Sequence, residues 1–168
     1  MSGHPLEPRL VAATVVAASF GALAAAYIAE FGFGLQPCVL CLYQRVPYAV
    51  AALLGAVALL PGVGGRGRLA LLTLAGLAFL TDTGIAAYHV GVEQHWWAGT
   101  AACSGAGQPQ PATVAELQAM LTRPPVVACD RPAWELFGVS MAGYNAVLSL
   151  GLGVATLAAV RLLWGKIA

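Results

Sequence analysis

The chain has 168 residues, of which 60% are hydrophobic and 9% are charged, and its formal net charge is +1. Its mean hydropathy is +0.79. Soluble domains contain roughly 45 to 50% apolar and about 25% charged residues, so this composition excludes an ordinary soluble domain. The sequence therefore predicts an integral membrane protein.

Four apolar segments have about the length of 20 residues that a helix needs to cross the hydrocarbon core. In chain order we expect these spans at about 10–29, 42–60, 69–89 and 137–160. The turn-forming run Pro61–Gly65 joins the second and third spans as a tight hairpin. The predicted fold is all-α: one membrane domain over 1–168, a four-helix bundle with a long loop at about 91–136.

Basic residues near the span ends predict the orientation, because they favour the cytoplasmic side. With both termini in the cytoplasm, that side holds Arg9, Arg66, Arg68, Arg161 and Lys166, and the opposite side holds Arg45, Arg123 and Arg131. This orientation places every cysteine outside the cytoplasm. Disulfides persist in that compartment, so topology and cysteine usage agree.

The long loop combines helix-breaking prolines at 108–111 and 123–125 with a short apolar pattern between them. Apolar residues recur there at helical spacing: Val114, Leu117, Met120 and Leu121. We expect a short helix at 113–121, lying either on the bilayer surface or on the top of the bundle. Trp96 and Trp97 are expected to anchor the loop at the membrane interface.

The four cysteines form two pairs, Cys38 with Cys41 at the start of the second span and Cys103 with Cys129 in the long loop. A C-x-x-C at a helix start favours reactive thiols, because the amide dipoles there stabilise a thiolate. The placement predicts dithiol chemistry at a membrane surface.

The cysteines allow three interpretations. A structural zinc site usually needs two closely spaced pairs, but Cys103 and Cys129 are 26 positions apart. An inert disulfide between Cys38 and Cys41 would constrain the unfolded chain little, because its loop is so short. A redox relay, in which one pair takes electrons from a partner's thiols and passes them to the other, accounts for both placements. We expect no bound metal.

A relay that oxidises thiols needs an electron acceptor, and the sequence contains no dinucleotide, haem or iron–sulfur motif. A quinone dissolved in the bilayer accepts two electrons and two protons. Cys38, Cys41 and Arg45 stand at i, i+3 and i+7, on one stripe of a helix. The Arg45 charge is thus predicted to stabilise a Cys41 thiolate and a quinone oxygen; the alternative is an arginine that snorkels to the span end.

The segment Pro37–Arg45 closely resembles the signature of the disulfide bond formation protein B family, DsbB. The resemblance extends to Tyr88–His89 at the end of the third span and to Leu136–Met141 before the fourth. It implies a quinone-dependent protein-disulfide oxidoreductase of the bacterial inner membrane. Such an enzyme reoxidises a periplasmic DsbA-like thiol oxidase and reduces ubiquinone or menaquinone. We expect no nucleic-acid partner.

The resemblance also implies roles for individual residues. The partner's thiolate attacks Cys103, whose loop partner is Cys129, and Cys38 then exchanges with Cys129, which leaves Cys41 to face the quinone. His89 matches a family position near the quinone; the alternative is an interfacial histidine that bonds water. Gln44 stands where some relatives carry an acid.

Two polar residues inside spans have no family role. Asp82 lies seven residues before His89 on the same helical face, and we expect it to hydrogen-bond to Thr81, Thr83 or a neighbouring helix. Asn145 is expected to link helices. The alternatives to the predicted function are a vitamin K epoxide reductase-like enzyme, a zinc-binding membrane module and a disulfide-stabilised structural protein.

Overall fold

The computed structural model of the chain describes residues 6–104, 113–121 and 127–167. Within them, four long helices are apolar enough to cross a membrane, which confirms the predicted all-α membrane fold. They are α1 (Leu6–Tyr27, continued by the π-helical turn η1, Ile28–Gly32), α2 (Val39–Leu59), α3 (Gly65–Glu93) and α6 (Met141–Ile167). The predicted long loop lies between α3 and α6.

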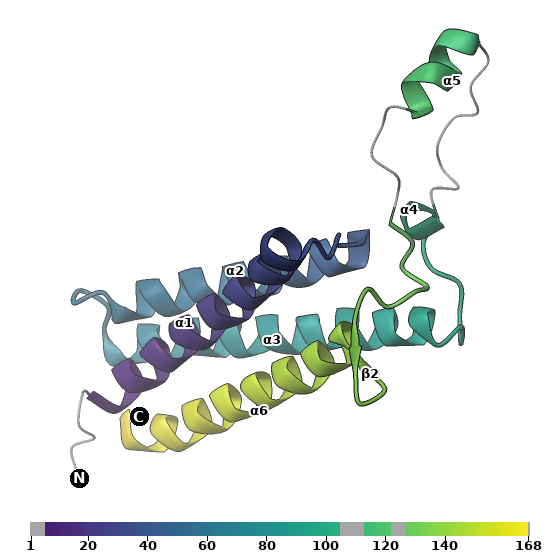
Figure 1. Ribbon diagram of the computed structural model, residues 1–168. Coiled ribbons are helices and arrows are strands. Elements are labelled where there is room, and N and C mark those ends of the chain that lie inside the picture. Colours follow the sequence, from purple (N-terminus) through teal and green to yellow (C-terminus); the bar gives the residue numbers. More distant parts are fainter. Residues whose placement is uncertain (1–5, 105–112, 122–126, 168) are drawn as a thin grey trace.

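The helix α3 is the centre of the bundle, because it packs along both α2 and α6, while α1 packs mainly on α2 (Figure 1). Small residues allow the close contact between α3 and α6. A Cβ atom added at Gly76 would lie 2.8 Å from Leu157, and one added at Gly153 would lie 2.7 Å from Leu80. Such small-residue contacts are typical of helices packed in membranes.

The outward faces of the helices carry large apolar side chains, among them Phe20, Leu53, Leu74 and Leu162. A helix that is apolar on all sides is typical of a protein interior or a membrane span. The connection between α2 and α3 is the predicted tight hairpin. There the buried Arg68 donates from Nε to the Ala58 carbonyl at 2.6 Å, and so caps the end of α2.

The helix α6 begins four residues later than the predicted start at Phe137. Residues before it form a small antiparallel hairpin of β1 (Glu135–Leu136) and β2 (Val139–Ser140). Phe137 and Gly138 both have positive φ, 53° and 76°, which gives the two-residue turn that joins such strands. A left-handed backbone at these two positions cannot continue a helix, so the span starts at Met141.

The long loop contains two short helices, α4 (Ala101–Ser104) and α5 (Val114–Leu121). The helix predicted at 113–121 is thus confirmed, and Thr113 and Glu116 begin it with a reciprocal capping box at 3.1 and 3.2 Å. Figure 1 draws α5 beyond α4, past the end of the bundle that lies away from the termini. The proline-rich breaks at 108–111 and 123–125 lie outside the described residues.

Candidate active site

The first element of the site is Cys38, which caps the N-terminus of α2. Pro37 precedes it, and its extended backbone (φ −76°, ψ 172°) turns its sulfur back over the first helical turn. Its Sγ accepts a hydrogen bond from the backbone N–H of Cys41 at 3.4 Å. The C-x-x-C spacing therefore places one sulfur at the positive end of the helix, as the sequence predicts.

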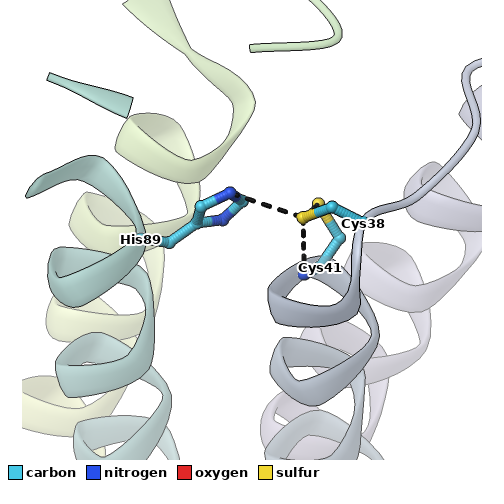
Figure 2. A group of neighbouring side chains, drawn as sticks. All are labelled: Cys38, Cys41 and His89. Atoms are coloured by element: carbon cyan, nitrogen blue, oxygen red, sulfur yellow. Dashed lines mark hydrogen bonds between the residues drawn. The ribbon is translucent and has the colours of Figure 1, made fainter. Parts of the chain in front are cut away.

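The Cys38 sulfur also lies beside the Cys41 sulfur and the His89 ring, and Figure 2 marks its contact with the ring. The Sγ atoms of Cys38 and Cys41 lie 3.1 Å apart, and Nε2 of His89 on α3 lies 3.5 Å from the Cys38 sulfur. The hydrogen bond from the Cys41 thiol lowers the pKa of Cys38 to about 4, against the opposing effect of burial and with further help from His89. Cys38 is therefore the thiolate of the pair at neutral pH.

The second cysteine pair is a disulfide between Cys103 and Cys129, with Cα atoms 5.1 Å apart. Both residues are buried in one apolar cluster with Cys38, Leu40 and Val92. Cys38 and Cys41 are free thiols. The structure thus holds a dithiol and a disulfide packed together at one end of the bundle.

A chain of polar side chains continues from His89 into the bundle. Gln44 on α2 bonds His89 Nδ1 through its Nε2 atom at 2.9 Å, and its Oε1 atom accepts from Asn145 Nδ2 at 2.7 Å. Asn145 also donates to Asp82 Oδ2 at 2.8 Å and accepts from the Tyr48 hydroxyl at 2.7 Å. Asn145 therefore links α6 to α2 and α3, as predicted, and it is the neighbouring-helix partner of Asp82.

Glu93 lies on the other side of the His89 ring. Its Oε1 atom is 3.7 Å from His89 Nε2, and its Oε2 atom accepts a hydrogen bond from Ser140 at the start of α6. Both the Cys38 sulfur and the Glu93 carboxylate thus face Nε2. Glu93 was not among the predicted site residues, although its spacing of four residues from His89 places both on one helix face.

A cavity of about 270 Å³ opens beside the dithiol. Its wall is mainly apolar and comes from α1, α2, α3, α6 and the segment before β1. Among the residues that line it are Cys38, Cys41, Gln44, Tyr48, His89, Glu93 and Asn145, together with Arg45. Ligand sites are typically such apolar hollows with a few polar groups at fixed positions.

Arg45 lines this cavity, but among the described residues its guanidinium makes no hydrogen bond to a cysteine. Its Nη1 atom is 2.6 Å from Glu30 Oε2 on η1, and its Cζ atom lies 4.6 Å from the centre of the Tyr27 ring. The side chain is held from the first helix by an ion pair and a cation–π contact. Glu30 was not among the predicted site residues, because no local spacing relates it to Arg45.

The ligand atoms of Cys38, Cys41 and His89 lie within 4.8 Å of one another, which is close enough for a shared metal ion. A metal on Nε2 needs that nitrogen unprotonated, and the other ring nitrogen then usually donates to an acceptor. Here Nδ1 faces the Gln44 amide nitrogen, which is itself a donor. The hydrogen bonds of His89 therefore fit a proton on Nε2 and thiol chemistry better than a metal ligand.

A disulfide packed against a reactive dithiol at one end of four membrane helices defines a class of membrane thiol–disulfide proteins. The comparisons with known proteins specify the family. The family model described as "Disulfide bond formation protein DsbB" matches residues 8–159. The chain belongs to the DsbB family of disulfide bond formation proteins and is a multi-pass membrane protein.

Individual relatives agree with the family match. The chain is 31% identical over 139 residues to a disulfide bond formation protein B of Methylobacillus flagellatus, covering 82% of this chain and 83% of that protein. It is equally identical, over 82% of this chain and 79% of the relative, to an uncharacterized protein of Rickettsia prowazekii. A disulfide bond formation protein B of Xanthomonas campestris is 43% identical over 74 residues, covering 44% and 43% of the two chains. No solved structure matches the chain.

Proposed function

We propose that the chain is a thiol:quinone oxidoreductase of the bacterial inner membrane. The whole of 1–168 acts as one four-span domain with cytoplasmic termini and periplasmic cysteines. It reoxidises a DsbA-like dithiol protein and passes the electrons to ubiquinone or menaquinone. The observation that carries the proposal is the packing of the Cys103–Cys129 disulfide in one cluster with Cys38, beside a cavity that Cys41 lines.

The first half of the reaction takes electrons from the partner. One partner thiolate attacks Cys103 Sγ, which forms a mixed disulfide and breaks the bond to Cys129. The second partner thiolate then attacks the partner's own sulfur, so the partner leaves as a disulfide and Cys103 leaves as a thiolate. Two electrons now reside on the thiols of Cys103 and Cys129.

The second half moves these electrons to the inner pair. Starting from an oxidised inner pair, the Cys129 thiolate attacks Cys38 and releases Cys41 as a thiolate. Cys103 then attacks Cys129, which restores the loop disulfide and releases Cys38. The products are a loop disulfide and an inner dithiol, the combination that the structure describes. The lowered pKa of Cys38 supports its role as the leaving thiolate.

A quinone fits the cavity by its chemistry, because the wall is mainly apolar and carries a few polar groups. When bound, it supplies the acceptor for two electrons and two protons. Cys41 lines the wall and presents the reduced sulfur, Arg45 would hold a quinone oxygen, and His89 at the same wall would move a proton through Nε2. The ion pair with Glu30 keeps the Arg45 side chain at this wall and shares its charge.

A trapping experiment tests the assignment of the two pairs. In a Cys38→Ser/Cys129→Ser variant, Cys103 is a free thiol without its loop partner. Its thiolate should attack a DsbA-like protein whose second active cysteine is replaced by serine and whose remaining cysteine carries a thionitrobenzoate disulfide. Thionitrobenzoate then leaves, and the mixed disulfide with Cys103 accumulates because Cys38, Cys129 and the partner's second cysteine are all absent. The matched control is Cys38→Ser/Cys103→Ser, which should trap much less partner. Mass spectrometry of the adduct decides the outcome: an adduct through Cys41 would reverse the outer and inner pairs.

A further inference from the structure

The hydrogen bonds that connect Asp82, Asn145, Gln44 and His89 have defined donors and acceptors, which the amide of Asn145 determines. Its Nδ2 atom donates one hydrogen to Asp82 Oδ2 and the other to Gln44 Oε1, and its Oδ1 atom accepts from the Tyr48 hydroxyl. Turning the amide over would place Oδ1 against two acceptor oxygens and lose both bonds. The Asp82 carboxylate thus fixes which way the Asn145 amide points.

The orientation of Asn145 fixes that of Gln44. Because Gln44 Oε1 accepts from Asn145, its Nε2 atom must face His89, and it lies 2.9 Å from Nδ1. An amide N–H needs a lone pair there, so the proton of a neutral His89 ring resides on Nε2. The groups that face Nε2 agree, since the Cys38 sulfur at 3.5 Å and the Glu93 carboxylate at 3.7 Å are both acceptors.

We propose that Asp82, Asn145 and Gln44 are positioning residues that hold His89 in the Nε2–H tautomer, with its proton directed at the Cys38 sulfur. Asp82 is the acid farthest from the ring, and Asn145 and Gln44 are the two amides that connect it to His89. None of the three has a hydrogen bond to a cysteine among the described residues. They act through His89, in the way that outer groups orient a catalytic or metal-bound histidine.

Because most of these side chains are buried, their hydrogen bonds can determine the tautomer of His89. Asp82 is 0% exposed, His89 3% and Gln44 7%, so bulk water has little access to these three groups, while Asn145 between them is half-buried. Asp82 also lies inside a membrane span, where an apolar residue would cost less free energy. An ionisable residue at such a position is typically functional.

The role rests on the proposed function, because it matters when Cys38 leaves Cys129 as a thiolate. At that step a hydrogen-bond donor aimed at the sulfur stabilises the charge that forms there. An Nδ1–H tautomer would present a lone pair to the same sulfur and oppose its departure. The hydrogen bonds from Asp82 to His89 therefore favour release of the Cys38 thiolate and completion of the electron transfer to the inner cysteine pair.

Nitrogen-15 NMR of the histidine rings in the reduced, detergent-solubilised full chain tests the proposal, with the His89 signals assigned from a His89→Gln variant. Wild type should show a bare Nδ1 and a protonated Nε2. Asn145→Leu removes the amide that joins Asp82 to Gln44. It should shift the tautomer ratio about two- to tenfold toward Nδ1–H, the range that one neutral hydrogen bond contributes. The pH at which Cys38 alkylation reaches half its plateau should rise in the same variant.

Two further variants separate positioning from general damage. Asp82→Asn keeps the side-chain volume, but its amide can donate to Asn145. All the hydrogen bonds from residue 82 to His89 can then run in the opposite direction, so this variant too should favour Nδ1–H. Thr83→Val is the matched control: it removes a 3.0 Å hydrogen bond between the Thr83 and Ser149 hydroxyls, which joins the same two helices, and it should leave the tautomer unchanged.

A protonated Nδ1 in wild type, an unchanged ratio in both Asn145→Leu and Asp82→Asn, or an equal change in Thr83→Val would overturn the proposal. Quinone-dependent thiol oxidation by the same wild-type preparation separates this result from the proposed function. Oxidation with the wrong tautomer refutes the positioning role alone. The expected tautomer without oxidation refutes the thiol:quinone activity alone.

Discussion

Replacing Arg45 by methionine removes one of the two arginines, Arg45 and Arg131, that line the cavity beside Cys41. The guanidinium forms a 2.6 Å ion pair with Glu30, and the two side chains are 14% and 17% exposed. Arg45→Met therefore has two consequences. It removes a donor to a bound quinone oxygen, and it leaves the Glu30 carboxylate unpaired in a partly buried position.

The two consequences have different sizes and can be separated. A hydrogen bond to a charged group contributes about 1.5 to 3 kcal/mol, which corresponds to about a ten- to hundredfold change in turnover or in the quinone concentration needed. An unpaired, fully buried charge costs about 3 to 5 kcal/mol, and the partial exposure of Glu30 reduces that cost. The double variant Arg45→Met/Glu30→Gln removes both charges, so it should regain stability but not quinone reduction.

Stopped-flow kinetics should follow the two half-reactions separately. We expect thiol exchange between Cys103 and a reduced partner to stay nearly unchanged in Arg45→Met, while quinone reduction falls. Arg45→Lys should lose less, because it keeps the charge but not the planar fork. Glu30→Gln is the matched control for loss of the ion pair with Arg45 in place. Equal damage to both half-reactions, or to neither, would show that Arg45 only anchors the end of the span.

Two more predictions concern topology and the Cys38 thiol. In intact cells, a membrane-impermeant alkylating reagent should label all four cysteines after mild reduction; labelling only after permeabilisation would contradict the proposed orientation. Because the pKa of Cys38 is lowered to about 4, its alkylation rate in the reduced protein should be flat above about pH 6 and fall as the pH drops through about 4. A rate that instead climbs through pH 8 to 9, as for an ordinary thiol, would contradict the thiolate assignment.

The sequence was sufficient to predict the four membrane-spanning helices and the position of the C-x-x-C dithiol at the start of one of them. Long apolar runs have one stable solution in a bilayer, the helix, so composition and length predict the spans. The C-x-x-C spacing likewise predicts a sulfur at a helix start, and Cys38 occupies the N-cap. His89 was a candidate only through the family resemblance, and the structure brings it to 3.5 Å from Cys38.

The contacts that the sequence did not predict join residues far apart in the chain. Gln44 and Asn145 are 101 positions apart, and Asp82 and Asn145 are 63 apart, so their bonds depend on how α2, α3 and α6 pack. The partner of Arg45 depends on the π-helical turn that brings Glu30 to it. The late start of α6 depends on two left-handed residues, only one of which is glycine.

The central claim is that electrons pass from a partner dithiol through both cysteine pairs to a quinone. The most direct test mixes the purified protein with excess reduced DsbA-like partner and quinone without oxygen, and measures thiols lost and quinol formed in one reaction. The account predicts two partner thiols lost for each quinol formed, and no turnover of either when Cys41 or Cys103 is replaced by serine. Thiol loss without quinol formation, or full turnover in the Cys103→Ser variant, would contradict it.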